Sequence, residues 1–204
     1  MSVADVKNCR ILFISPAGKV VRQLGTTGSC AHDPPRSFAS PNGDTPLPDG
    51  GTLVTEINGS WIDAISPTGS LEWSVHALAG YPSDAQWLGD GKILLADYSS
   101  PGHVLIMTTT GRVLWKYGPP SGDGALNHPS LALMLPNGLI AVNDDYRNRV
   151  ILIDQATHRI VWQYGHTDGS GRNRGYLNTP DGMDFLPFAV AMGDPVLRTL
   201  VTGS

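Results

Sequence analysis

The side chains that could do chemistry in this chain include three carboxylates near the starts of similar segments. Asp44, Asp84 and Asp184 each follow an opening proline within a few residues. Carboxylate oxygens bind hard cations and accept hydrogen bonds from polar ligands. Because the three do not recur at one fixed offset, a structural role explains them less well. They are predicted to bind a cation or another polar ligand.

Two loop histidines are candidate acid–base groups, because imidazole titrates near neutral pH. His32 precedes Asp33 in the segment CAHDPP, and His128 stands in LNHP. A lone loop histidine is more often a hydrogen-bonded or exposed residue, so catalysis is the less favoured hypothesis. His128 is its best candidate, whereas His32 and Arg147 are predicted to bind ligand. The sequence contains no nucleophile elbow, zinc-ligand spacing or phosphate-binding glycine loop.

A second set of acids does recur at one offset. Glu56, Asp97 and Asp144 each close a predicted second strand of a repeated unit. An acid at a strand end can accept backbone N–H groups of a turn, or pair with a cation such as Arg149. Their presence in every complete repeat favours a structural role over catalysis.

The elements that position these residues form a repeat. Four segments share an opening proline, a leucine six residues later and a following turn: PNGDTPLPDG, PSDAQWLGDG, PSLALMLPNG and PDGMDFLP. The leucines are Leu47, Leu88, Leu135 and Leu186. An Asp-Gly or Asn-Gly pair follows in the first three, which is a strong hairpin signal. Three further strands follow each of these turns. The last of them, the fourth strand of the unit, contains LEWSV, RVLWKYG or RIVWQYG.

A unit of four short antiparallel strands, repeated every roughly 40 to 50 residues, is typical of a β-propeller blade. The sequence predicts an all-β single domain with blades at residues 41–76, 82–118 and 129–165. Residues 10–25 match only a third and a fourth strand, and residues 180–204 form a partial, irregular blade. With 24 Gly, 16 Pro and only 16% charged residues in 204, a helical bundle is disfavoured.

At these residues the sequence resembles two related propeller repeat families. The stretch LNHPSLALMLPNGLIAVNDDYRNRVILID resembles an NHL repeat, and SPTGSLEW and TTTGRVLW are similar to the docking motif of quinoprotein-type (PQQ-like) blades. The resemblance implies that Trp73, Trp115 and Trp162 pack between blades. The resemblance also implies, as an alternative to a binding function, an enzyme whose site lies at the mouth of the central channel of the propeller, which the first strands line. Quinoprotein dehydrogenases, arylsulfotransferases and propeller lactonases are the analogies. The absence of a vicinal cysteine pair weakens the quinoprotein version.

Propellers of these families have more blades than the three complete ones found here, which leaves two hypotheses. The two ends of the chain could combine into a fourth blade and close a small ring. Alternatively, the chain is an arc, which is the hypothesis that we favour. An arc leaves apolar sheet faces open, so it is predicted to self-associate.

The two cysteines, Cys9 and Cys30, flank the hairpin at residues 10–25. Antiparallel pairing brings the ends of a hairpin together, so a disulfide is geometrically plausible, with two free thiols as the alternative. A bridge would favour an extracytoplasmic location. The net charge of −4 argues against a nucleic-acid partner. No apolar run approaches the roughly 18 residues of a membrane span.

Strand order places the fourth-to-first connections and the second-to-third turns on one face, the loop-rich face. We predict a non-enzymatic propeller scaffold that binds a protein, glycan or small ligand there. No cofactor is predicted, although a cation at the channel mouth is compatible with the acids. The alternatives are an enzyme with its site at that mouth and a divergent fragment without independent function. They are separated by whether Asp44, Asp84, His128 and Asp184 share one cavity.

Overall fold

The structure is a computed structural model that describes residues 1–185. Fifteen strands lie in four antiparallel sheets, and within each sheet every strand pairs with the next one along the chain. The N-terminal sheet contains β1 (Ser2–Asp5), β2 (Arg10–Ile14) and β3 (Val20–Leu24), and the second sheet contains β4 (Pro41–Pro46), β5 (Thr52–Glu56), β6 (Trp61–Ile65) and β7 (Leu71–His76). The third contains β8 (Pro82–Gly89), β9 (Lys92–Asp97), β10 (His103–Thr108) and β11 (Val113–Tyr117), and the fourth contains β12 (Pro129–Met134), β13 (Leu139–Asp144), β14 (Arg149–Asp154) and β15 (Arg159–Gly165).

Short 3-10 turns, η1 (Val6–Asn8) and η2 (Asp145–Arg147), are the helical elements of the described residues. None of the described helices is long and apolar enough to cross a membrane. The prediction of an all-β fold built from four-stranded antiparallel blades is therefore confirmed for the three complete sheets. Leu186 and most of the predicted irregular blade at 180–204 lie outside the described residues.

The repeat is visible in the register of the first two strands of each complete sheet. The residue directly before each of Leu47, Leu88 and Leu135 pairs with the first or second residue of the next strand. The pairs are Pro46 with Thr52, Trp87 with Ile93, and Met134 with Ile140. The hairpin glycines between these strands have the positive φ that the Asp-Gly and Asn-Gly pairs predict, for example +90° at Gly50 and +84° at Gly138. The three leucines therefore occupy matching places.

The N-terminal sheet has one strand more than predicted. The sequence was expected to supply only a third and a fourth strand at residues 10–25, but β1 pairs with β2 and takes the place of a second strand. β1 is four residues long and lacks the proline and hairpin turn that mark the other repeats, which explains why the pattern missed it. Cys9, directly before β2, forms a disulfide with Cys30 in the loop after β3.

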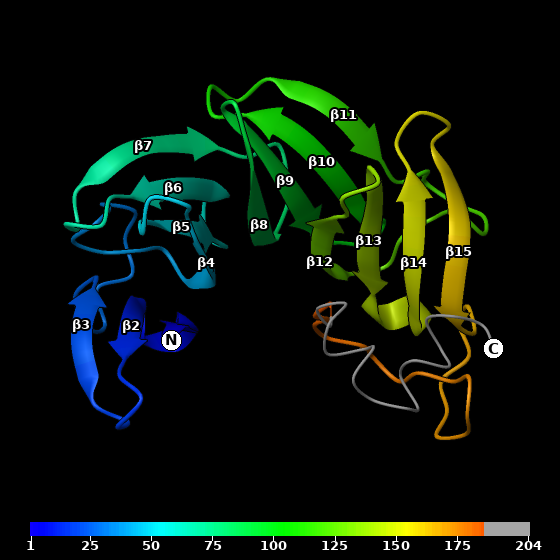
Figure 1. The fold of residues 1–204 in the computed structure, drawn as a ribbon, viewed down its shortest axis with the longest axis horizontal. Coiled ribbons are helices and arrows are strands. Elements are labelled where there is room, and N and C mark those ends of the chain that lie inside the picture. The colour runs from blue at the N-terminus through cyan, green and yellow to red at the C-terminus, as the bar shows by residue number, and fades with distance from the viewer. Residues whose placement is uncertain (186–204) are drawn as a thin grey trace.

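The four sheets follow one another along an open arc rather than a closed ring (Figure 1). The first strands β4, β8 and β12 pack beside one another along its inner side, and β7, β11 and β15 lie along its outer side. A separate apolar cluster fills each of the three spaces between neighbouring sheets. These clusters are built around Phe38 and Ile65, around Ile62 and Leu105, and around Val104 and Ile151. Stacking therefore buries the faces that a single sheet would expose.

The predicted inter-blade tryptophans behave differently along the arc. Trp73 packs on the cluster shared with the third sheet, near Trp87. Trp115 donates its ring N–H to the Gln155 carbonyl of the fourth sheet at 3.0 Å. Arg22 occupies the equivalent place in the N-terminal sheet and donates to a carbonyl of the second sheet. Trp162 is 48% exposed, so its predicted packing is wrong for the described residues, because they include no sheet beyond the fourth.

This difference gives a stability test. Trp115→Ala is expected to lower the free energy of unfolding by about 2–4 kcal/mol, because it removes a large inter-sheet contact and a hydrogen bond. The matched change Trp162→Ala is expected to cost less than about 1 kcal/mol. Urea unfolding of both variants measures the difference, and equal losses would contradict the inter-sheet role of Trp115.

Candidate functional site

The recurring carboxylates at the second-strand ends hold the loops of the loop-rich face. Each one is buried and accepts a backbone N–H from the connection that precedes its own sheet. The donors are Ala39 for Glu56, Tyr81 for Asp97 at 2.9 Å, and Asn127 for Asp144 at 2.7 Å. This geometry supports the structural role expected of the three acids, with the difference that the bonded loop is the preceding one.

A basic group faces the other oxygen of each carboxylate. Arg149 Nε lies 2.7 Å from Asp144, His103 Nδ1 lies 3.3 Å from Asp97, and His32 Nδ1 lies 3.0 Å from Glu56. Arg149 and His103 begin the third strand of their own sheet, whereas His32 comes from the loop between the N-terminal and second sheets. Burial raises the pKa of Glu56 and of Asp144, and the Arg149 guanidinium opposes this rise at Asp144.

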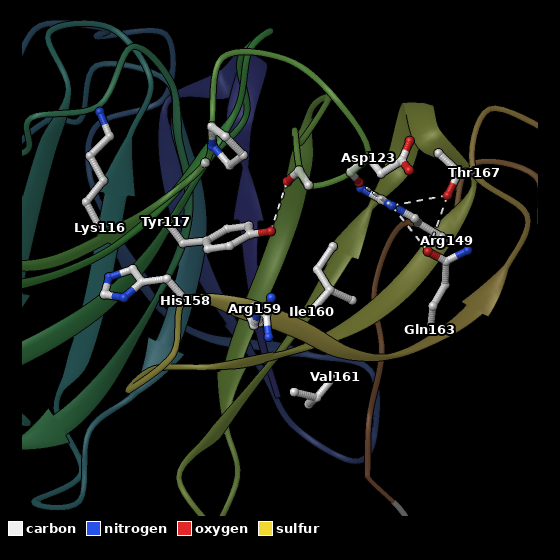
Figure 2. Close-up of a pocket in the computed structure, with 13 residues that line it drawn as sticks. Lys116, Tyr117, Asp123, Arg149, His158, Arg159, Ile160, Val161, Gln163 and Thr167 are labelled. Carbon is white, nitrogen blue, oxygen red and sulfur yellow. Dashed lines mark hydrogen bonds between the residues drawn. The ribbon is translucent and has the colours of Figure 1, made fainter.

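Arg149 ties three strands to the preceding loop, as Figure 2 shows. Beyond its ion pair with Asp144, its guanidinium donates to the carbonyls of Asp123 and Ala125 and to the side chains of Gln163 and Thr167. The side chain is 1% exposed, so it is a buried cation, and each of its three guanidinium nitrogens donates at least one hydrogen bond. It is a structural anchor rather than a ligand-binding group.

Arg147, predicted to bind ligand, is occupied by the protein itself. Its guanidinium makes a two-pronged ion pair with Asp168 and donates to the carbonyls of Gly122, Asp123 and Ala125. The Arg147 hydrogen bond lowers the pKa of the Asp168 carboxyl. The structure therefore gives this arginine a loop-fixing role, which sequence reasoning missed because Asp168 lies in the next connection along the chain.

Two of the predicted binding acids do share a cavity. Asp44 on β4 and Asp84 on β8 line a hollow of about 360 Å³ at the beginning of the first strands. The hollow is completed by Asn42, Thr45, Ser83, Ser130 and Asp181. We call it the acid pocket. Its third carboxylate, Asp181, belongs to the segment after the fourth sheet and was not singled out from the sequence, although it stands in the opening PDG of the last repeat.

The acid pocket carries negative charge without a cationic side chain to balance it. None of the ion pairs in the described residues includes Asp44, Asp84 or Asp181. Asp84 accepts hydrogen bonds from Thr45 and from the backbone amide of Ala85, whereas one buried oxygen of Asp44 has no partner among residues 1–185. Burial raises the pKa of both Asp44 and Asp84, and the Asp44 charge adds to the rise at Asp84.

The other two expected members of this cavity lie elsewhere. Asp184 is exposed and does not line the acid pocket. His128 is also absent from its lining, and its ring packs against Tyr98 and Tyr146, with centroids 4.8 and 4.3 Å away. Of the four residues whose sharing of one cavity was to separate an enzyme from a scaffold, Asp44 and Asp84 line the acid pocket and His128 and Asp184 do not.

The rings around His128 form an aromatic group next to the acid pocket. Its members are Tyr81, Tyr98, His128 and Tyr146. They come from two inter-sheet connections and two second-to-third turns, so they stand on the loop-rich face. Burial is the main cause that raises the pKa of Tyr81 and of Tyr98, and the negative charge of Asp181 adds to both rises. The same carboxylate thus borders both the acid pocket and the aromatic group.

A larger hollow of about 1040 Å³ lies between the outer strands of the third and fourth sheets (Figure 2). Its lining includes Tyr117, Arg149, Ile160 and Val161. The Tyr117 hydroxyl donates a hydrogen bond to the Gly124 carbonyl, and each guanidinium nitrogen of Arg149 donates a hydrogen bond as described above. We interpret this hollow as the wedge left where neighbouring sheets diverge, because its buried polar groups already bond to the protein. The smaller acid pocket is the better ligand site.

No protein-family model and no curated protein sequence matches the chain. Its fold is similar to that of solved β-propeller proteins. Virginiamycin B lyase from Staphylococcus aureus shares 18% identity at a TM-score of 0.56 over 78% of this chain and 50% of that one. A streptogramin B lyase shares 16% identity at a TM-score of 0.54, over 81% of this chain and 53% of that one. Kuenenia stuttgartiensis hydrazine synthase shares 14% identity at a TM-score of 0.57, over 79% of this chain and 44% of that one.

The chain therefore spans about half the length of the solved lyases that it matches. At these identities the likeness establishes the fold alone. The predicted β-propeller resemblance is confirmed at that level. The finer assignment to NHL and quinoprotein-type repeats stays a prediction.

Asp145, beside the acid pocket, gives a pH-dependent prediction. Its carboxyl is 1% exposed, Ser130 donates to one oxygen, and the other has no partner. Burial, opposed by Ser130 and assisted by the charges of Asp181 and Asp144, raises its pKa to about 7. This value exceeds the roughly 3.9 of an unfolded aspartate. Protonation therefore stabilises the folded state, and that stabilisation is lost as pH rises through 7.

Asp145→Asn is expected to raise the free energy of unfolding at pH 8 by about 1–3 kcal/mol and to converge with the wild type near pH 4. The exposed Asp184→Asn serves as the matched control and should leave the profile unchanged. Urea unfolding across this pH range measures both. A variant of Asp145 that is less stable than wild type at pH 8 would contradict the assignment.

Proposed function

We propose that the chain is a non-enzymatic β-propeller scaffold that binds a small organic cation on its loop-rich face. The observation that carries the proposal is the convergence of Asp44, Asp84 and Asp181 on one cavity in which no cationic side chain of residues 1–185 pairs with them. A ligand that brings positive charge offsets the repulsion among these acids and the cost of partly burying Asp44 and Asp84.

The aromatic group favours an organic cation over a bare metal ion. Ammonium groups are attracted to the faces of tyrosine rings, in addition to carboxylates. Asp181 lines the acid pocket and its charge acts on Tyr98, whose ring lies 6.2 Å from that of Tyr146, so a ligand extending from the pocket past Asp181 would approach these rings. A cavity of about 360 Å³ matches the lower range of small-ligand sites. The excess of acids makes a neutral glycan the weaker candidate.

The enzymatic alternative receives less support from the geometry. Its acid–base candidate, His128, is held in the aromatic group and does not line the acid pocket. General acid–base catalysis requires a titratable group within hydrogen-bond reach of the reacting atom. The described pocket offers carboxylates that suit ion binding, without a histidine or a nucleophilic pair beside them.

The test is calorimetric titration with 1,4-diaminobutane, tetramethylammonium chloride, calcium chloride and glucose as probes. The diamine is expected to bind, with an affinity that falls as salt concentration rises. Asp84→Asn is expected to weaken binding at least about tenfold, because it removes one charge that faces the ligand. Asp184→Asn, the same change at an exposed aspartate, should leave the affinity unchanged.

Each remaining result has a defined meaning. Binding of calcium alone would replace the organic cation by a metal ion, and binding of glucose alone would favour a glycan. Either result would contradict the proposal, as would a diamine affinity that is equal in wild type and Asp84→Asn.

A further inference from the structure

One buried position separates the second sheet from the other three. The third residue of the third strand is aliphatic in the N-terminal, third and fourth sheets, where it is Leu12, Leu105 and Ile151. In β6 the same place is held by Asp63. Its side chain is 0% exposed, its polar neighbours include Glu56 and Ser74, and no donor hydrogen of the described residues reaches either carboxylate oxygen. Buried carboxylates without partners are rare and costly, so this one calls for a binding partner.

The charges around Asp63 are unbalanced. In the fourth sheet, Asp144 is matched by the buried guanidinium of Arg149. In the second sheet the place of that arginine is held by Trp61, on whose ring the His32 imidazole stacks at 4.2 Å. Glu56 and Asp63 therefore face one imidazole. One imidazole carries at most one positive charge, so when both acids are ionised one negative charge is left without a counter-charge.

The three side chains converge as metal ligands do. One ligand atom from each of His32, Glu56 and Asp63 lies within 4.8 Å of the other two. In a tetrahedral zinc site with bonds of about 2.0–2.2 Å the ligand atoms are about 3.3–3.6 Å apart, so the widest of the three separations has to close by at most about 1.5 Å. We propose that His32, Glu56 and Asp63 bind one divalent transition-metal ion, with Zn²⁺ as the best match to this ligand set.

The choice of metal follows from the ligand atoms. An imidazole nitrogen suits zinc and its neighbours, whereas calcium and magnesium prefer sites made of oxygen atoms alone. Zinc also accepts three protein ligands and a water molecule. The His32 side chain is 25% exposed, so the fourth position can be reached from solvent.

Surrounding contacts already hold the ligands in place. The Ala39 amide donates to the second oxygen of Glu56, and Ser74 lies 3.5 Å from the other ring nitrogen of His32. The Cys9–Cys30 disulfide fixes the loop two residues before His32. Such outer contacts orient ligands and raise metal affinity. The bound ion would pin this loop and the N-terminal sheet to the second sheet.

The test uses untagged, chelator-treated protein titrated with zinc chloride by calorimetry. The expected result is one ion per chain, with the affinity lowered more than about 100-fold in His32→Gln. His103→Gln is the matched control, because it changes the same kind of imidazole–carboxylate pair in the third sheet, where Leu105 replaces the second acid. Its zinc affinity should equal that of the wild type.

Two further measurements keep the result independent of folding. Asp63→Leu introduces the residue found at Leu105, so it is expected to remove zinc binding while raising the melting temperature of the metal-free protein. Cobalt chloride should give the wild type a visible absorption band that His32→Gln lacks. A wild type without zinc binding or a cobalt band would show that Glu56 and Asp63 share a proton instead, and would overturn the proposal. Equal weakening by His32→Gln and His103→Gln would also overturn it.

Discussion

The interaction on which this structure depends is the buried carboxylate that closes each complete second strand. One oxygen holds the backbone of the preceding connection, and the other faces a basic group. Breaking a buried ion pair such as that of Asp144 and Arg149 by removing one partner typically costs about 3–5 kcal/mol. The inter-sheet connections, which range from the short segment 77–81 to the longer segment 25–40, contain none of the named strands. These bonds therefore help to determine where the loop-rich face places its side chains.

The same anchor position also shows how a repeated scaffold acquires individual sites. The basic partner is Arg149 in the fourth sheet and His103 in the third. In the second sheet it is replaced by a tryptophan and a histidine from a disulfide-tethered loop, next to an additional acid. A single blade can thus change its local chemistry while its strands keep their register, which is how function is added to a common fold.

The sequence predicted what depends on local periodicity. Leucines at one offset and Asp-Gly turns identified the three complete sheets, and recurring acids identified Glu56, Asp97 and Asp144 as structural. Contacts between distant segments were less accessible. The pairing of Arg147 with Asp168 depends on two loops at the same end of the fourth sheet. The convergence of Asp181 with Asp44 and the approach of His32 to Asp63 depend on how separate sheets and their connections are placed. Asp63 nevertheless leaves a signal, because an acid stands where the aligned repeats have Leu105 and Ile151.

The role of the carboxylate anchors can be measured at a single amide. Tyr81 donates its backbone N–H to Asp97, in the sheet where the group facing the other carboxylate oxygen is His103. In Asp97→Ala, nuclear magnetic resonance should show exchange of the Tyr81 amide hydrogen at least about tenfold faster than in wild type, while the Leu95 amide in β9 keeps its protection. Unchanged exchange at Tyr81 would show that the loop is held by other contacts, and would contradict the anchoring role given to these acids.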